Sequence, residues 1–147
     1  MRRKEKALEY FRNSFNCSQS VFTVFGTDFG LKEDDCLRTA CAFGGGMGRC
    51  QHTCGAATGA LMAIGARKGK GLNDPESRKL ETYELTISFL KFFNGRNGSL
   101  VCKDLLEGLD MNNPAELEEI KKKNLYVVKC EKYITDAVEI TEELLIV

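Results

Sequence analysis

The sequence has no excess charge of either sign, no long apolar run and a single histidine. Its 21 lysine and arginine residues balance 21 aspartate and glutamate residues, so no basic footprint for a nucleic acid is present. The apolar stretch ALMAIGA, residues 60–66, is far shorter than the roughly 18 residues that a membrane-spanning helix needs. We therefore expect neither a nucleic acid nor a membrane as a partner.

The single histidine also limits the catalytic arrangements. No serine–histidine–acid set is visible, and a cysteine–histidine pair would require His52. The basic segment MRRKEKALEYF at the N-terminus is followed by no apolar stretch typical of a secretory signal. We therefore expect a cytoplasmic protein, whose thiols the cell keeps reduced.

Cysteine, by contrast, is abundant. The chain has seven, and because this number is odd, at least one has no partner for an intramolecular disulfide. In a cytosolic chain this density indicates metal or redox chemistry before a disulfide framework. The seven are Cys17, Cys36, Cys41, Cys50, Cys54, Cys102 and Cys130.

The 147 residues are expected to form one domain, residues 1–147, which is large enough to fold without a disulfide. Helical patterns run through the whole sequence, and no internal repeat or linker interrupts them. We predict an all-α, single-domain bundle of six or seven helices. The only candidate strand is the short segment LYVV at 125–128, which has no obvious partner.

Several helix starts can be located from their capping residues. Asn16 with Gln19 three positions later forms a capping box. Thr53 is a plausible N-cap for a helix through about residue 68, and Ser99 for a short helix to residue 106. Asp74 and Asn113 each precede a proline, which suits the first position of a helix. The last helix is expected from about residue 129.

Four cysteines fall at these starts: Cys17, Cys54, Cys102 and Cys130. The first turn of a helix presents unpaired N–H groups and about half a positive charge, and both favour a thiolate over a thiol. We therefore predict lowered pKa values for these cysteines.

Small residues follow Cys54 at once. Gly55, Gly59, Ala63 and Ala66 approximate one face of the helix, and such a face lets a neighbouring backbone approach closely. Our hypothesis is that several helix starts, each with its cysteine, converge around Cys54. The GGGMG run at 44–48 cannot form a stable helix interior, since each glycine costs about 1 kcal/mol there. It predicts a close-packed turn that helps Cys54 reach its neighbours.

Two further patterns indicate core residues. The spacing of Leu80, Tyr83, Ile87 and Leu90 predicts a buried stripe on a helix over residues 75–93. Three nearby phenylalanines are also assigned to the core: Phe89, Phe92 and Phe93.

The remaining cysteines have more ordinary interpretations. Cys36 and Cys41 lie in an amphipathic segment and are expected to fill the core. Cys50 could resolve a disulfide at Cys54, or join His52 and Cys54 as a metal ligand. Only one zinc-like pair of cysteines is present, so a solvated loop histidine is the preferred interpretation of His52.

Five segments together resemble one known family. NCSQSV at 16–21, FGGGMG at 43–48, CGAATG at 54–59, GSLVCKDLLEG at 98–108 and Cys130 are similar to the C_GCAxxG_C_C family, whose members have a suspected redox role. The resemblance implies a domain of about this size with four signature cysteines, here Cys17, Cys54, Cys102 and Cys130. It implies no substrate.

The sequence departs from the family pattern in three places. Cys36, Cys41 and Cys50 are additional cysteines. RCQHTC at 49–54 has a cysteine and a histidine where ordinary polar residues are expected. Cys130 is followed by Glu131 rather than by a proline.

The favoured function is thiol–disulfide chemistry, in an enzyme of the oxidoreductase type, with Cys54 as the nucleophile. Cys17, Cys102 and Cys130 are candidates for the resolving thiol or a second pair, and four cysteines allow three pairings. The expected partner is an unidentified redox protein or a small thiol or disulfide, and homo-oligomers are possible.

Two alternatives remain open at this point. The four cysteines could bind zinc or an iron–sulfur cluster for electron transfer, although their spacings are unlike those of ferredoxins. The chain could also be a helical interaction module whose cysteines only pack.

Overall fold

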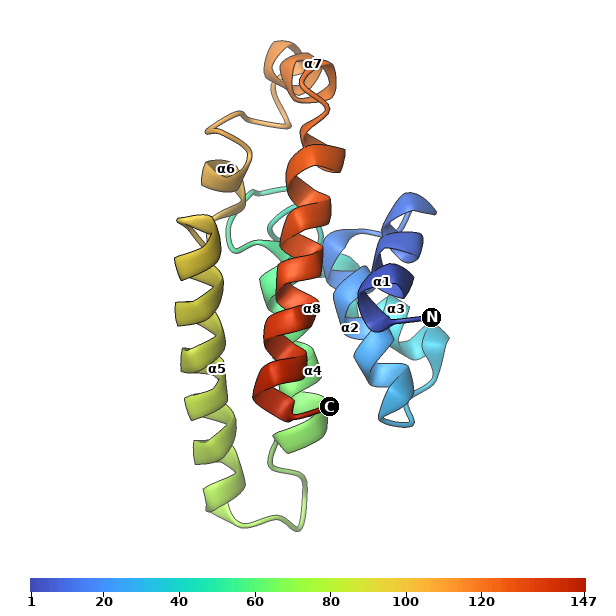
Figure 1. The fold of residues 1–147 in the computed structure, drawn as a ribbon, viewed down its shortest axis with the longest axis vertical. Helices are drawn as coiled ribbons and strands as arrows, with labels where there is room; N and C mark the ends of the chain where they lie inside the picture. Colours follow the sequence, from blue (N-terminus) through green and yellow to red (C-terminus); the bar gives the residue numbers. More distant parts are fainter.

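Eight α-helices joined by short turns build residues 1–147 in the computed structural model (Figure 1). The all-α class is confirmed, and the structure has eight helices where six or seven were expected. The helices are α1 (Arg3–Arg12), α2 (Cys17–Asp28), α3 (Glu33–Ala40), α4 (Gly55–Lys68), α5 (Glu76–Asn97), α6 (Cys102–Leu105), α7 (Pro114–Lys122) and α8 (Glu131–Leu145).

The three longest helices, α4, α5 and α8, run alongside one another and contact each other in every pairing (Figure 1). Helices α1, α2 and α3 cover one side of this group, and α6 and α7 lie at one end (Figure 1). The centre of the core contains the fully buried Phe25, Ile64, Phe89, Phe93 and Ile134. None of the helices combines the length and apolar character needed to cross a membrane.

The capping box that the sequence predicts at α2 is present. The Asn16 side chain accepts from the Gln19 N–H at 3.0 Å, and the Gln19 side chain accepts from the Asn16 N–H at 2.9 Å. The helix includes Gly26 and ends at Asp28. A Cβ at Gly26 would lie 2.5 Å from the Cys36 sulfur, so this glycine makes room for α3.

Three of the predicted caps lie elsewhere. Cys54, not Thr53, is the N-cap of α4, because Thr53 forms an isolated antiparallel bridge with Val101. Pro75 is the N-cap of α5 rather than its first residue, and the Asp74 side chain accepts from the Gly71 N–H in the preceding turn. Val101 is the N-cap of α6 in place of the predicted Ser99.

Other predicted starts hold. Asn113 caps α7 by accepting from the N–H groups of Ala115 and Glu116, with Pro114 at the first helical position, as expected.

The segment 125–128 is helical rather than a strand. Its backbone enters a π-helical turn, Tyr126–Cys130, that continues without a break into α8.

The stripe that the sequence assigns to the core lies on the outside of α5. Leu80, Tyr83 and Ile87 are 54%, 57% and 66% exposed, and Phe92 is also exposed. Only the fourth member of the stripe, Leu90, is partly buried against the core. Helix α5 turns the side carrying Phe89 and Phe93 toward α4 and α8 instead. Helical spacing determines which residues share a face, but it does not determine which face points inward.

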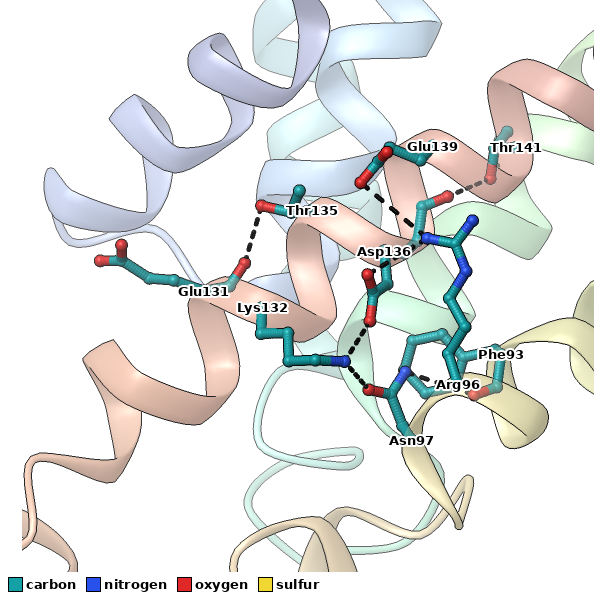
Figure 2. A network of polar contacts seen from close by, with 10 residues as sticks. Phe93, Arg96, Asn97, Glu131, Lys132, Thr135, Asp136, Glu139 and Thr141 are labelled. Carbon is teal, nitrogen blue, oxygen red and sulfur yellow. Dashed lines mark hydrogen bonds and ion pairs between the residues drawn. The ribbon is translucent and has the colours of Figure 1, made fainter.

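A polar network fixes α8 against α5 (Figure 2). The buried Asp136 accepts from Lys132 at 2.7 Å and from Arg96 of α5 at 3.2 Å, and Lys132 also donates to Asn97. At the first residue of α8, Glu131 accepts two hydrogen bonds from Arg12 of α1. The start of α8 is therefore held from two sides.

Candidate functional site

The site is organised by the contact between α2 and the first two turns of α4. A Cβ added at Gly59 would lie 2.7 Å from the Ser18 carbonyl oxygen, and one at Gly55 would lie 3.2 Å from the Cys17 Cβ. These distances leave no room for a larger side chain at Gly59. The small-residue face thus admits the start of α2, and brings Cys17 beside the residue that follows Cys54.

A short antiparallel pairing brings the third cysteine close. The Cys54 N–H donates to the Leu100 carbonyl at 2.8 Å, and the Cys102 N–H donates to the His52 carbonyl at 2.6 Å. Between these two bonds lies the Thr53–Val101 bridge. The start of α6 is thereby held next to the start of α4, with Cys102 beside Cys54.

The glycine turn packs against this pairing, as the sequence predicts. Gly46 has φ +68°, and a Cβ there would lie 2.6 Å from the His52 nitrogen and 2.8 Å from the Cys102 Cβ. The buried Gln51 then holds the loop before α7, since it donates to the Leu109 carbonyl and accepts from the Met111 N–H, each at 2.8 Å.

The fourth signature cysteine is Cys130. It lies where the π-helical turn passes into α8, with helical backbone angles. The last helix thus begins beside Cys130, as expected, but the π-helical turn leads into it without a break, so its first turn is not an open helix end. The Cys130 thiol neighbours that of Cys17 and is the largest cause of the raised pKa of Cys17.

Three of the four signature cysteines open onto one pocket of about 370 Å³. Cys17 is half-buried, whereas Cys102 and Cys130 are nearly covered, and all three line this pocket. Cys54 is only 5% exposed and lies outside the lining. The rest of the lining is mainly apolar, with Phe11, Phe15, Leu106, Met111 and Tyr126.

The prediction of lowered thiol pKa values is wrong for Cys17, Cys54 and Cys102. Burial raises the pKa of Cys54 to about 12, and the neighbouring Cys17 adds to the rise. Hydrogen bonds from the N–H groups of Ala56 and Ala57 act in the opposite direction, as a helix start should, but they are outweighed. The convergence of these segments excludes water, and the loss of hydration opposes the charged forms of Cys17, Cys54 and Cys102.

The same causes act on the other thiols. Burial raises the pKa of Cys102 to about 12, with Cys54 and Cys17 contributing. The neighbouring Cys130, followed by burial, raises the pKa of Cys17 well above its ordinary value. The cysteines influence one another because they form a single cluster.

The additional cysteines lie outside this cluster. Cys36 packs in the core against Gly26, as expected, but Cys41 is exposed, contrary to its assignment to the core. Cys50 and His52 are also exposed. No three histidine, cysteine, aspartate or glutamate side chains are grouped so that they could hold a metal ion, so the zinc and iron–sulfur alternative gains no support from the geometry.

Sequence reasoning did not find the aromatic and cationic part of the pocket. Phe11 and Phe15 come from the end of α1 and the turn after it, Tyr126 from the π-helical turn, and Arg49 from the loop after the glycines. The only signal for Arg49 is its position between the glycine turn and Cys54. Nothing in the sequence indicates that these four segments meet.

A sequence model of the family described as Putative redox-active protein (C_GCAxxG_C_C) matches residues 15–144. The chain belongs to the C_GCAxxG_C_C family. The match contains all four signature cysteines and supports a general redox role. No curated protein and no solved structure matches the chain.

Substitution of Gly59 by alanine tests the close approach of α2 and α4. The new methyl group would meet the Ser18 carbonyl, so Gly59→Ala should lower the free energy of unfolding by about 1–3 kcal/mol. Gly65→Ala, in the same helix with open space around it, should be neutral or stabilising by up to about 1 kcal/mol. Urea unfolding of both variants measures the difference, and equal effects would contradict the packing described.

The raised thiol pKa values predict that stability falls in alkali. Between pH 9 and 12 the folded state keeps the proton on Cys54 that the unfolded state has lost. Stability is therefore complete below about pH 9 and declines above it, by up to about 1.4 kcal/mol per thiol and pH unit. Urea midpoints of the reduced protein from pH 7 to 11 measure this decline. Cys54→Ala should make it less steep, and an identical slope would show that Cys54 contributes nothing.

Proposed function

We propose that this C_GCAxxG_C_C protein is a thiol–disulfide oxidoreductase in which Cys17 and Cys130 are the exchanging pair. The observation that carries the proposal is that both side chains line one pocket and that Cys130 is the largest cause of the raised pKa of Cys17. Two neighbouring thiols form a disulfide when an oxidant removes their protons and two electrons.

Cys17 is a better candidate than Cys54 for the first attack on a disulfide. It is half-buried and lines the pocket, whereas the remaining three signature cysteines are no more than 9% exposed. Because the pKa of Cys17 is raised, little thiolate forms at neutral pH. The attack should therefore be slow there and become faster as the pH rises.

Cys54 and Cys102 are proposed as the second pair behind the first. Cys54 adjoins both Cys102 and Cys17. Cys17 raises the pKa of Cys54, and both Cys54 and Cys17 raise the pKa of Cys102. Of the three pairings that four cysteines allow, this arrangement favours Cys17 with Cys130 and Cys54 with Cys102. Exchange between Cys17 and Cys54 would pass a disulfide inward from the pocket.

Disulfide mapping tests the pairing. A Cys41→Ser, Cys50→Ser background removes the two exposed cysteines that would otherwise scramble the products. After mild oxidation with diamide, peptide mass spectrometry without reduction should find Cys17 linked to Cys130, with the loss of two hydrogens. Cys130→Ser should abolish this link, and Cys36→Ser, which changes a buried cysteine outside the cluster, should retain it. A different linkage, or none, would contradict the proposal.

A further inference from the structure

The pocket beside the exchanging pair has one charged side chain in its lining, that of Arg49. The backbone of Arg49 has φ +64° and is held by two hydrogen bonds. The Arg49 N–H donates to the Gly44 carbonyl at 3.2 Å, and the Arg49 carbonyl accepts from the Asn112 side chain at 2.7 Å. The loop therefore fixes the position from which this arginine reaches the pocket.

The charge of Arg49 acts on the pocket wall. Burial raises the pKa of the Tyr126 phenol, and the positive charge of Arg49 works against that rise. No aspartate or glutamate belongs to the lining, so the guanidinium meets no carboxylate of the protein inside the pocket.

We propose that the pocket binds a small-molecule disulfide that carries a carboxylate, and this inference rests on the proposed thiol–disulfide function. A volume of about 370 Å³ falls within the range of small-molecule sites. Phe15 and Tyr126 provide apolar surface for the organic part, and Arg49 provides a planar donor that suits a carboxylate.

The reaction balances in two exchanges. The Cys17 sulfur attacks one sulfur of the bound disulfide, forming a mixed disulfide and releasing the first small thiol, which takes the proton from Cys17. The Cys130 sulfur then attacks Cys17, forming the protein disulfide and releasing the second small thiol with the proton from Cys130. The ligand gains two electrons and the protein loses two.

Two disulfide probes that differ in charge test this specificity in the Cys41→Ser, Cys50→Ser background. The anionic probe is 5,5′-dithiobis(2-nitrobenzoate), and the neutral probe is 2,2′-dithiodipyridine, both of which release coloured thiols. Arg49→Gln should slow the reaction with the anionic probe by about tenfold, the loss expected for one charge-assisted hydrogen bond, and should leave the neutral probe within about twofold. Arg38→Gln, an exposed arginine on α3, is the control and should change neither rate.

The outcomes separate the two proposals. If Arg49→Gln slows both probes equally, or neither, while Cys17 and Cys130 still become linked, the carboxylate specificity is wrong and the thiol–disulfide function stands. If no probe produces a protein disulfide in the parent background, both are wrong.

A second inference comes from the outer face of α5, which forms one edge of the bundle (Figure 1). The exposed residues Glu76, Leu80, Tyr83, Ile87 and Lys91 recur at helical spacing along this face. The acidic residue stands at one end of the apolar stripe and the basic residue at the other.

We infer that a second copy of the chain covers this stripe in an antiparallel pairing. A two-fold axis passing between Tyr83 and Glu84 would bring Leu80 of each copy opposite Ile87 of the other. The same axis brings Glu76 opposite Lys91 at both ends, so that one operation matches both the apolar and the charged positions. One helix pair buries less area than a typical stable interface, so the dimer should be weak.

Sedimentation equilibrium from about 1 to 300 µM tests the pairing, since this range spans a weak dissociation constant. The wild type should dimerise with increasing concentration and Ile87→Glu should stay monomeric, while Leu72→Glu, at a 97% exposed position off the stripe, should behave as wild type. Glu76→Lys alone should weaken the dimer, and adding Lys91→Glu should restore it. A monomeric wild type, or a double variant no better than the single one, would overturn the inference.

Discussion

The close approach of α2 to α4 is the constraint on which the rest of the site depends. Gly59 lies under the Ser18 carbonyl and Gly55 lies against Cys17, so the two helices meet with almost no side chain between them. This contact brings Cys17 beside Cys54. The Thr53–Val101 bridge then adds Cys102, and the fixed start of α8 adds Cys130. The glycines in CGAATG therefore act on the chemistry through packing.

Burial and the helix ends act on the thiols in opposite directions, and burial is the larger effect. The N–H groups at the start of α4 favour the Cys54 thiolate, as a helix end should, and so oppose the rise in its pKa. Convergence of the helix starts, however, excludes the water that would stabilise a thiolate, and each thiol also opposes ionisation of its neighbours. At neutral pH, Cys17, Cys54 and Cys102 therefore stay protonated. The proposed exchange would then start when one of these thiols loses its proton, rather than from a permanently activated thiolate.

Local signals in the sequence predicted the parts of the fold that depend on neighbouring residues. The capping box at Asn16 and the Asn113–Pro114 start are both present, and the glycine turn packs as expected. The stripe on α5 was placed on the wrong side, because periodicity does not include the position of other helices. The pocket and the burial of Cys54 could not be predicted, since they depend on a pairing between residues near 53 and residues near 101. No local pattern marks that pairing.

Linkage between folding and oxidation gives the Cys17–Cys130 pair a further consequence. The fold places two thiols that are far apart in the chain at one pocket, which favours the proposed disulfide between them over one with an outside thiol. Because folding and oxidation are linked, a disulfide that the fold favours also stabilises the fold. Closing a loop of roughly 110 residues constrains the unfolded chain by about 4–5 kcal/mol in the chain-entropy model. If Cys17 and Cys130 exchange disulfides as proposed, the redox state of this pair would therefore alter the stability of the bundle strongly.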